Sequence, residues 1–193
     1  NIPNAPKIST ENIPFIYEGR VKKPLVLEGE TLGIALNQYL DNQHSKIVSL
    51  SNLNLTIPDE EEDEEEFRKC NLSDLILSKY NEVILNNNNM ENFSLENKKI
   101  KSLDLSYCNI KKSNFENCNI DNLIMDNTFQ INNNFKKSKV NNFRAQSAEC
   151  HVSDFSESDW GINKKYVGDK KYDFSFMDDV MRYSYFDLCK WEK

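Results

Sequence analysis

A period of five residues runs through the middle of the chain. Steps of five from Leu75 to Trp160 visit eighteen positions, and seventeen of them are hydrophobic. A chain that is 38% hydrophobic would fill about seven such positions by chance. A helix repeats every 3.6 residues and a strand every 2, so neither buries a line of side chains with this spacing. The period therefore predicts a repeat architecture in which each five-residue unit turns one large side chain inward.

The other positions of the five-residue unit also follow a pattern. The residue two before the large one is often small, and the residue between them is often Asn or Asp. Clear examples are Ser113–Asn114–Phe115, Cys118–Asn119–Ile120 and Ser153–Asp154–Phe155. This pattern resembles the pentapeptide-repeat family, whose repeat is written A(D/N)LXX. The resemblance covers about 90 of the 193 residues, and its specificity lies in the uninterrupted register.

The resemblance implies a fold that is mainly β, namely a right-handed, parallel, four-sided β-helix with twenty residues in each turn. Residues twenty apart then stack on one face, and three of the four inward ladders are apolar throughout. The fourth ladder runs Met90, Ile110, Gln130, Cys150. We expect a local bulge at Gln130 that swings an apolar neighbour inward. We also expect the Asn-rich stretches 86–90 and 132–134 to expose their amides in ladders on the outside.

The same register places the β-helix within the chain. Residues 46–160 are expected to form the pentapeptide-repeat solenoid that the resemblance implies, with 46–57 as its first rung, because Leu50 and Leu55 keep the step of five. Residues 59–69 are expected to be an acidic loop inserted between this rung and the rest of the coil.

The two ends of a stacked solenoid expose apolar atoms and unpaired strand edges, so they need covers. Residues 1–45 are expected to form a small α/β cap at the N-terminal end, with a strand at 24–27 and a helix at 31–41. Residues 161–193 are expected to form a helical cap at the C-terminal end, with an amphipathic helix at 173–191.

Charge and aromatic residues single out two candidate binding regions. Eight consecutive acids account for the whole formal charge of −7, since the rest of the chain is nearly neutral. Such a block is either a solvated loop or a docking site for a basic partner. The aromatics near the C-terminus either cover the open coil or form a partner surface, including a homodimer. The candidate partner-binding residues are Asp59, Glu60, Glu61, Glu62, Asp63, Glu64, Glu65, Glu66, Tyr183, Tyr185 and Trp191.

Motifs that carry chemistry are not found in the sequence. It holds no Gly-rich phosphate loop, GxSxG elbow or HExxH helix. Five cysteines without a CxxC pair, and two histidines, do not make a zinc site or a disulfide framework. Cys150 and His151 are adjacent, so in a strand they face opposite sides and cannot act as a pair. We therefore predict no enzyme, no cofactor and no catalytic or metal-ligating residue.

Direct binding to nucleic acid is also not expected, and neither is a membrane-spanning segment. Residues 70–160 carry 10 basic and 12 acidic side chains, a net charge of −2, so they offer no basic groove. No stretch approaches the roughly 18 to 20 apolar residues that span a bilayer.

What remains is binding to another protein. Some members of the family that the chain resembles are secreted bacterial effectors whose β-helix recruits host proteins, and others mimic DNA and bind type II topoisomerases. We expect a non-enzymatic protein–protein interaction module, the target-recognition part of an effector that is secreted into a host cell, where it binds a host protein. The alternatives are a cytoplasmic, DNA-mimicking inhibitor or protector of gyrase, and the substrate-binding domain of a larger enzyme such as a ubiquitin ligase. Because the chain begins at Asn1 without a Met, we expect a fragment or processed product whose catalytic domain, if any, lies outside it.

Overall fold

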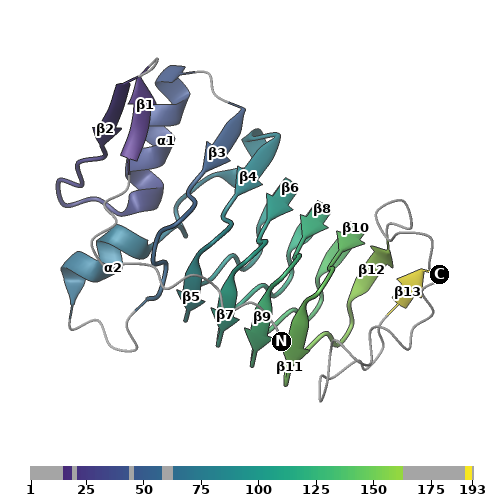
Figure 1. The fold of residues 1–193 in the computed structure, drawn as a ribbon. Helices are drawn as coiled ribbons and strands as arrows, with labels where there is room; N and C mark the ends of the chain where they lie inside the picture. The colour runs from purple at the N-terminus through teal and green to yellow at the C-terminus, as the bar shows by residue number, and fades with distance from the viewer. Residues whose placement is uncertain (1–14, 19–20, 44–45, 58–62, 163–189, 193) are drawn as a thin grey trace.

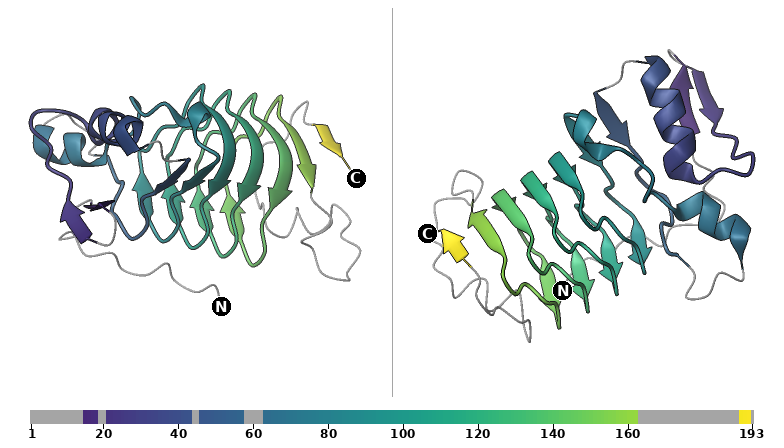
Figure 2. Two further views of the ribbon diagram at one scale, coloured as in Figure 1. Left: turned by 90° about the horizontal axis from the view of Figure 1, so that it is seen from above. Right: turned by 180° about the vertical axis from the view of Figure 1, so that it is seen from behind.

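The computed structural model of the protein describes residues 15–18, 21–43, 46–57, 63–162 and 190–192. Its main body is a parallel β-solenoid of about four turns (Figure 1). Seen from above, the successive coils form a row of parallel arcs, with α1 and α2 beside the first of them (Figure 2). The prediction of a mainly β repeat solenoid is confirmed.

The coils stack through two parallel sheets. The seven-stranded sheet has the order β13-β12-β10-β8-β6-β4-β3, and the four-stranded sheet has the order β11-β9-β7-β5. The strands of the larger sheet are β3 (Ile47–Ser49), β4 (Glu82–Ile84), β6 (Lys99–Asp104), β8 (Asn119–Ile124), β10 (Lys139–Arg144), β12 (Asp159–Ile162) and β13 (Lys190–Glu192). Those of the smaller sheet are β5 (Asn89–Glu91), β7 (Asn109–Lys111), β9 (Phe129–Ile131) and β11 (Glu149–His151).

Residues twenty apart lie on neighbouring coils. Ile100 pairs with Ile120, and Ile120 pairs with Val140, in an unbroken parallel register. From Val83 onward the large residues of the five-residue unit are buried along the axis, apart from the partly buried Ala145, and so are the small ones two positions earlier. Cys118, for example, is 1% exposed and donates from Sγ to the Leu95 carbonyl at 2.7 Å. The predicted inward register is therefore confirmed over these coils.

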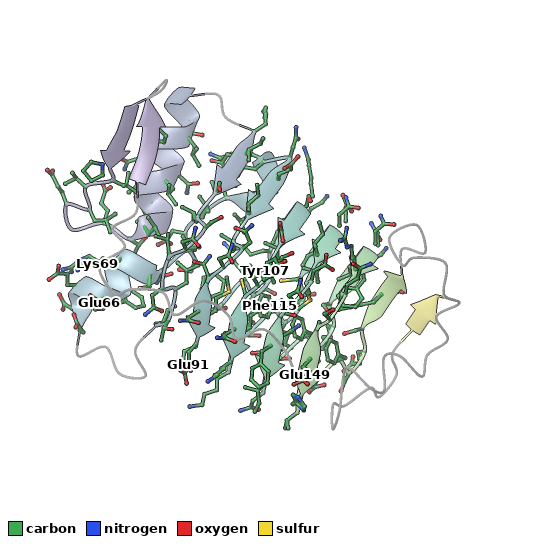
Figure 3. All side chains as sticks on the ribbon, in the orientation of Figure 1. Glu66, Lys69, Glu91, Tyr107, Phe115 and Glu149 are labelled. Atoms are coloured by element: carbon green, nitrogen blue, oxygen red, sulfur yellow. The ribbon has the colours of Figure 1, made fainter. Side chains whose placement is uncertain are left out.

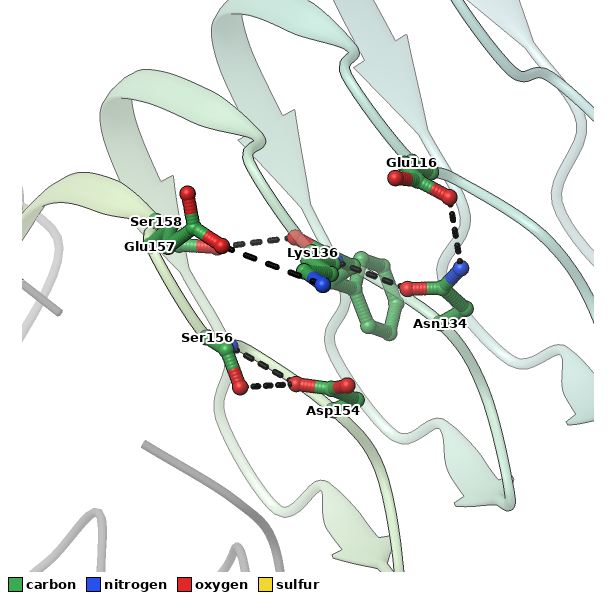
Figure 4. Close-up of polar contacts among 8 residues, drawn as sticks. Glu116, Asn134, Lys136, Asp154, Ser156, Glu157 and Ser158 are labelled. Carbon is green, nitrogen blue, oxygen red and sulfur yellow. Dashed lines mark hydrogen bonds and ion pairs between the residues drawn. The ribbon is translucent and has the colours of Figure 1, made fainter. Parts of the chain in front are cut away.

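The corners of the coil explain why the chain is rich in Asn. The residue two after the large one has a positive φ at thirteen non-glycine positions, and seven of these are Asn: Asn52, Asn87, Asn92, Asn97, Asn117, Asn127 and Asn132. Asn tolerates this left-handed region better than most residues. The Asn or Asp before the large residue serves the corner differently, because its side chain accepts a bond from the backbone two residues on. Asn134 Oδ1 accepts from Lys136 N at 2.9 Å, and Asp154 Oδ1 accepts from Ser156 N at 2.8 Å (Figure 4).

The bulge expected at Gln130 is wrong. β9 pairs without a break with β7 on one side and β11 on the other, and Gln130 itself points inward and is 2% exposed. Its Nε2 donates to Thr128 Oγ1 at 3.1 Å inside the coil. A bulge would disrupt hydrogen bonds to both neighbouring strands, so the fold keeps the strand and buries the amide.

The expectation of purely external Asn ladders is also only partly right. Asn109 Nδ2 does donate to Asn89 Oδ1 at 3.2 Å on the outside. Asn88 and Asn133, however, lie inside, at 0% and 2% exposure. Asn133 Nδ2 donates to the Ile110 carbonyl at 3.0 Å, so the buried amide has a backbone partner.

The N-terminal region packs a helix against the first coil. Helix α1 (Leu32–Gln43) confirms the predicted helix, and Thr31 Oγ1 accepts from Ile34 N at 3.3 Å at its start. The predicted strand is displaced: β2 (Val21–Pro24) pairs antiparallel with β1 (Phe15–Glu18). The leucines of α1 at 32, 36 and 40 are buried in the same core as the coil residues.

The C-terminal end of the larger sheet continues with a strand. β13 pairs in parallel with β12, and the Cα of Trp191 lies opposite that of Trp160. The predicted helix at 173–191 lies outside the described residues except at its end, and there the prediction of a helix is wrong. A parallel ladder gives Lys190–Glu192 hydrogen-bond partners that an isolated helix end lacks.

Candidate protein-interaction surfaces

An insertion interrupts the first coil without disturbing its register. β3 pairs with β4 between residues 35 apart, against 20 in later coils, so the first coil holds 15 extra residues. Before the insertion the coil stays paired, because Leu50 N donates to Ile84 O at 2.8 Å and Leu55 N donates to Asn89 O at 2.9 Å. After it, Leu75 and Tyr80 are again buried at the inward positions. The extra residues therefore leave the inward positions of this coil filled, and the acidic run lies among them.

The second half of the predicted acidic loop is a helix. Helix α2 (Glu64–Cys70) begins after Asp63, whose side chain accepts from Glu66 N at 3.1 Å. This N-cap, and acids in the first turn beside the positive end of the helix dipole, both stabilise the helix. Arg68 and Lys69 follow in the last turn. The loop prediction is therefore wrong for these residues, because self-repulsion among the acids is offset by the dipole and by the two bases.

Ion pairs along α2 neutralise only part of its charge. Glu64 lies 3.4 Å from Arg68, and Glu65 lies 2.7 Å from Lys69. The Glu65 carboxylate, which accepts a hydrogen bond from Lys69, raises the pKa of the Lys69 ammonium. Four acids from Asp63 to Glu66 still face two bases, and all four acids are exposed. Figure 3 shows Glu66 and Lys69 on the side of α2 that points away from the solenoid.

The structure separates the two predicted binding regions. Asp63 caps α2, and Glu64, Glu65 and Glu66 form its first turn, beside the first coil. Trp191 lies in β13 at the opposite end of the solenoid (Figure 1). Residues 59–62, Tyr183 and Tyr185 lie outside the described residues. The described acids, from Asp63 to Glu66, and Trp191 therefore lie at opposite ends of the solenoid.

A third surface was missed by the sequence interpretation. Phe129 and Ile131 occupy the two outward positions of β9, where the neighbouring coils carry polar residues, and both are half-buried. Val152, at the corner after β11, is 44% exposed. The signal was present in the sequence as apolar residues at positions that the repeat leaves free. Such positions face water, so an apolar residue there is unexplained by the fold.

A shallow open hollow runs along the corner beside this surface. It is lined by Lys112, Ser113, Asn114, Asn132, Asn133, Asn134, Val152 and Asp154. Its polar groups are mostly amides that already serve the backbone, as Asn133 and Asn134 do. The lining holds one carboxylate, one amine and one hydroxyl, so it offers a polar contact surface and no nucleophile–base pair.

The four cysteines of the described residues are buried. Burial raises the pKa of the Cys108 and Cys118 thiols to about 12, and that of Cys70 to about 11. Cys150 points inward, whereas the neighbouring His151 places Nε2 3.1 Å from Glu149 Oε2 on the outside. The two residues thus face opposite sides, as expected. Among the described residues, no group of three His, Cys, Asp or Glu side chains is placed to hold a metal ion.

No helix in the described part of the chain is long and apolar enough to cross a membrane. A scan of protein-family models found no match to the chain, and searches of curated proteins and of solved structures found none either.

Proposed function

We propose that the protein is a non-enzymatic protein–protein interaction module whose contact element is the acidic insertion of the first coil. The observation that carries this proposal is the insertion itself. It adds 15 residues to a coil whose inward positions are filled before it by Leu50 and Leu55 and after it by Leu75 and Tyr80. Its described part displays four exposed acids. An element that the stacking does not need, and that carries most of the net charge, is suited to a binding role.

The partner that fits this element is a protein with a basic segment. Exposed carboxylates steer a basic partner toward the surface and favour it over acidic ones. The solenoid supplies a rigid base, since α2 ends at the buried Cys70 and is followed directly by the buried Asn71 and Leu72. A fixed helix loses less conformational entropy on binding than a free acidic tail does.

The resemblance to the pentapeptide-repeat family supports the finer parts of the proposal. On this view the solenoid is the right-handed, four-sided form, covered at both ends, and the chain is the target-recognition part of a bacterial effector that is secreted into a host cell. The DNA-mimicking reading has less support, because the coil from Cys70 to Trp160 has a net charge of only −2. A DNA mimic needs acids spread along the whole rod.

The test compares two triple variants of equal charge change. One variant carries Glu64→Gln, Glu65→Gln and Glu66→Gln on α2, with the Asp63 cap kept. The control carries Glu82→Gln, Glu96→Gln and Glu157→Gln, three exposed acids on the coil. Circular dichroism and a urea titration first establish that both fold, because losing first-turn acids costs α2 about 0.3–1 kcal/mol each.

Both variants and the natural chain are then immobilised, and proteins bound from animal-cell and bacterial lysates are identified by mass spectrometry. We expect a host protein that the natural chain and the coil variant capture and the α2 variant loses, more so at low salt. Equal capture by all three would remove α2 from the binding role. Capture of gyrase from the bacterial lysate, lost with the coil acids, would favour the DNA-mimic alternative.

A further inference from the structure

The outer face of the four-stranded sheet has an apolar centre between polar coils. We call it the small-sheet face and define it by the outward residues of β7, β9 and β11 together with the corner residues 112, 132 and 152. Its middle coil presents Phe129 and Ile131, and the Phe129 ring lies 5.8 Å from the His151 ring of the next coil. The equivalent positions one coil earlier are Asn109 and Lys111. Two adjacent apolar side chains therefore replace an amide and a charge at positions that face water.

Val152 has a backbone conformation that valine rarely adopts. Its φ is 50°, a left-handed value that is a rare outlier for a β-branched residue. The equivalent corners of the earlier coils carry Asn92, Lys112 and Asn132, two of them the residue type that tolerates this region best. Folding alone favours Asn here, yet the chain keeps a strained valine and leaves it 44% exposed. An exposed apolar side chain held at a strained position points to a contact outside the coil.

Charges on the small-sheet face change sign across the apolar centre. The coil before it carries Lys111 and Lys112, both exposed, and the coil after it carries Glu149. Lys112 Nζ lies 3.5 Å from Glu91 Oε1 of the preceding coil. Among the described residues, Lys111 is therefore the base that is left for another partner. Figure 3 shows Glu91 and Glu149 at the same edge of the solenoid, on β5 and β11.

We propose that the small-sheet face binds a second copy of this chain, with the two solenoids antiparallel. A two-fold axis along β9 places the Phe129 and Ile131 pair of one copy against the same pair of the other. It brings Lys111 of each copy to the coil that carries Glu149 of its partner. A parallel arrangement would instead set the coil of Lys111 and Lys112 against the same coil of the partner. The face is therefore self-complementary only in the antiparallel sense, as an isologous interface requires.

This contact is independent of the acidic insertion, so it goes beyond the proposed function. The two α2 helices would lie at opposite ends of the pair and stay accessible. The face spans only a few short strands, and small interfaces of this kind are weak and transient. The association is therefore concentration-dependent and favoured at low salt.

The first experiment replaces each apolar residue by one found at the same position of an earlier coil. The variants are Phe129→Asn, Ile131→Lys and Val152→Asn, and the control is Tyr107→Asn, which removes an exposed aromatic from another face at a corner where Asn87 and Asn127 occur. Sedimentation velocity over a wide concentration range measures association. We expect a dimer for the natural chain and the control, and at least a tenfold weaker association for each of the three variants.

Val152→Asn separates binding from folding. Relief of the strained backbone should raise the melting temperature by about 2–4 °C, while the dimer weakens at least tenfold. A residue needed only for the fold would move both quantities in the same direction. A variant that melts lower and associates as the natural chain does would overturn the proposal.

The second experiment tests the antiparallel arrangement by charge reversal. Lys111→Glu alone sets acid against acid across the two-fold axis, and Glu149→Lys alone sets base against base. Each variant is expected to be monomeric, while an equimolar mixture forms a heterodimer because both charge contacts are then restored. A natural chain that stays monomeric at every concentration, or a mixture that does not associate, overturns the proposal. The proposal is also overturned if other residues of the same chain cover Phe129, so that the association does not respond to these variants.

Discussion

The buried thiols show how single residues link the core to solution conditions. Cys108 and Cys118 fill small inward positions, and their Sγ atoms donate to the carbonyls of Leu85 and Leu95 at 3.0 and 2.7 Å. A thiolate there would lose its hydration and face carbonyl oxygens, so burial raises both pKa values to about 12 from 9.0. The native state therefore keeps these protons longer than the unfolded chain does.

That difference fixes the sign of a pH dependence. Below the unfolded pKa of 9.0 both states are protonated and the full stability is present; as the pH rises toward 12 only the unfolded state loses protons, so stability falls. We expect the free energy of unfolding to drop by about 1 kcal/mol per thiol between pH 8 and 10. Urea titrations across this range measure it, with Cys108→Ala/Cys118→Ala as the control that flattens the curve. A natural chain that is equally stable at both pH values would show that the thiols ionise freely.

At the scale of the element, α1 depends on a close approach that only glycine permits. Gly33 lies in the first turn of α1, and its N–H donates to the Asn71 carbonyl at 3.0 Å. A Cβ at this position would lie 2.8 Å from Leu75 N, a backbone atom that cannot give way. The helix therefore packs on the first coil at a distance that a side chain would prevent.

Gly33→Ala is expected to push α1 away from the coil and to lower stability by about 1–3 kcal/mol, although Ala is the better helix former. Hydrogen exchange measures the local effect, with faster exchange in α1 and little change in β8 and β10. Ile34→Ala, at an exposed position of the same helix, is the matched control. If Gly33→Ala were as stable as this control, the helix would not be held by the close contact.

The elements that could be predicted are those whose signal lies within each five-residue unit. Burial of Leu105, Phe115 and the other register positions follows from sequence alone, because each unit repeats the same inward and outward pattern. The helix α2 was hidden, because its Asp63 cap and its i,i+4 pairs lie inside a charge run that is typical of a loop. The strand β13 was hidden as well, because Phe176, Met177, Val180 and Met181 follow the spacing of an amphipathic helix and the predicted helix was extended from them to Trp191.

The small-sheet face was missed for a different reason. The apolar residues Phe129 and Ile131 stand in the sequence at positions that the repeat leaves free, but only the pairing of the strands places them beside Val152. The Gln130 bulge failed because backbone pairing with both neighbouring strands outweighs the cost of one buried amide. Local patterns therefore predicted the coil, whereas contacts between coils determine which side chains meet on its surfaces.

For the whole molecule, stacked aromatic rings connect the coils along the axis. The Phe135 ring lies 4.8 Å from Phe115 and 4.9 Å from Phe155, nearly parallel to both, and the edge of Trp160 packs 5.5 Å from it. Each coil contacts only its neighbours, so the stability of a solenoid is close to a sum of coil and interface contributions. Loss of one ring in the middle should therefore weaken the coupling between the two ends.

Phe135→Ala is expected to cost about 3–5 kcal/mol and to split unfolding into two steps. Both tryptophans of the chain, Trp160 and Trp191, lie in strands at the C-terminal end, so their fluorescence reports that end while far-UV circular dichroism reports every coil. In the natural chain the two signals should change at the same urea concentration. In the variant the fluorescence should change first, because the coils beyond the cavity lose their support while the first coils keep their core with α1.

The control is Asn117→Lys, at an exposed corner where the next coil already carries Lys137, and it should leave the two transitions coincident. Coincident transitions in Phe135→Ala as well would mean that the coils unfold as one unit and that the ring ladder does not set their coupling.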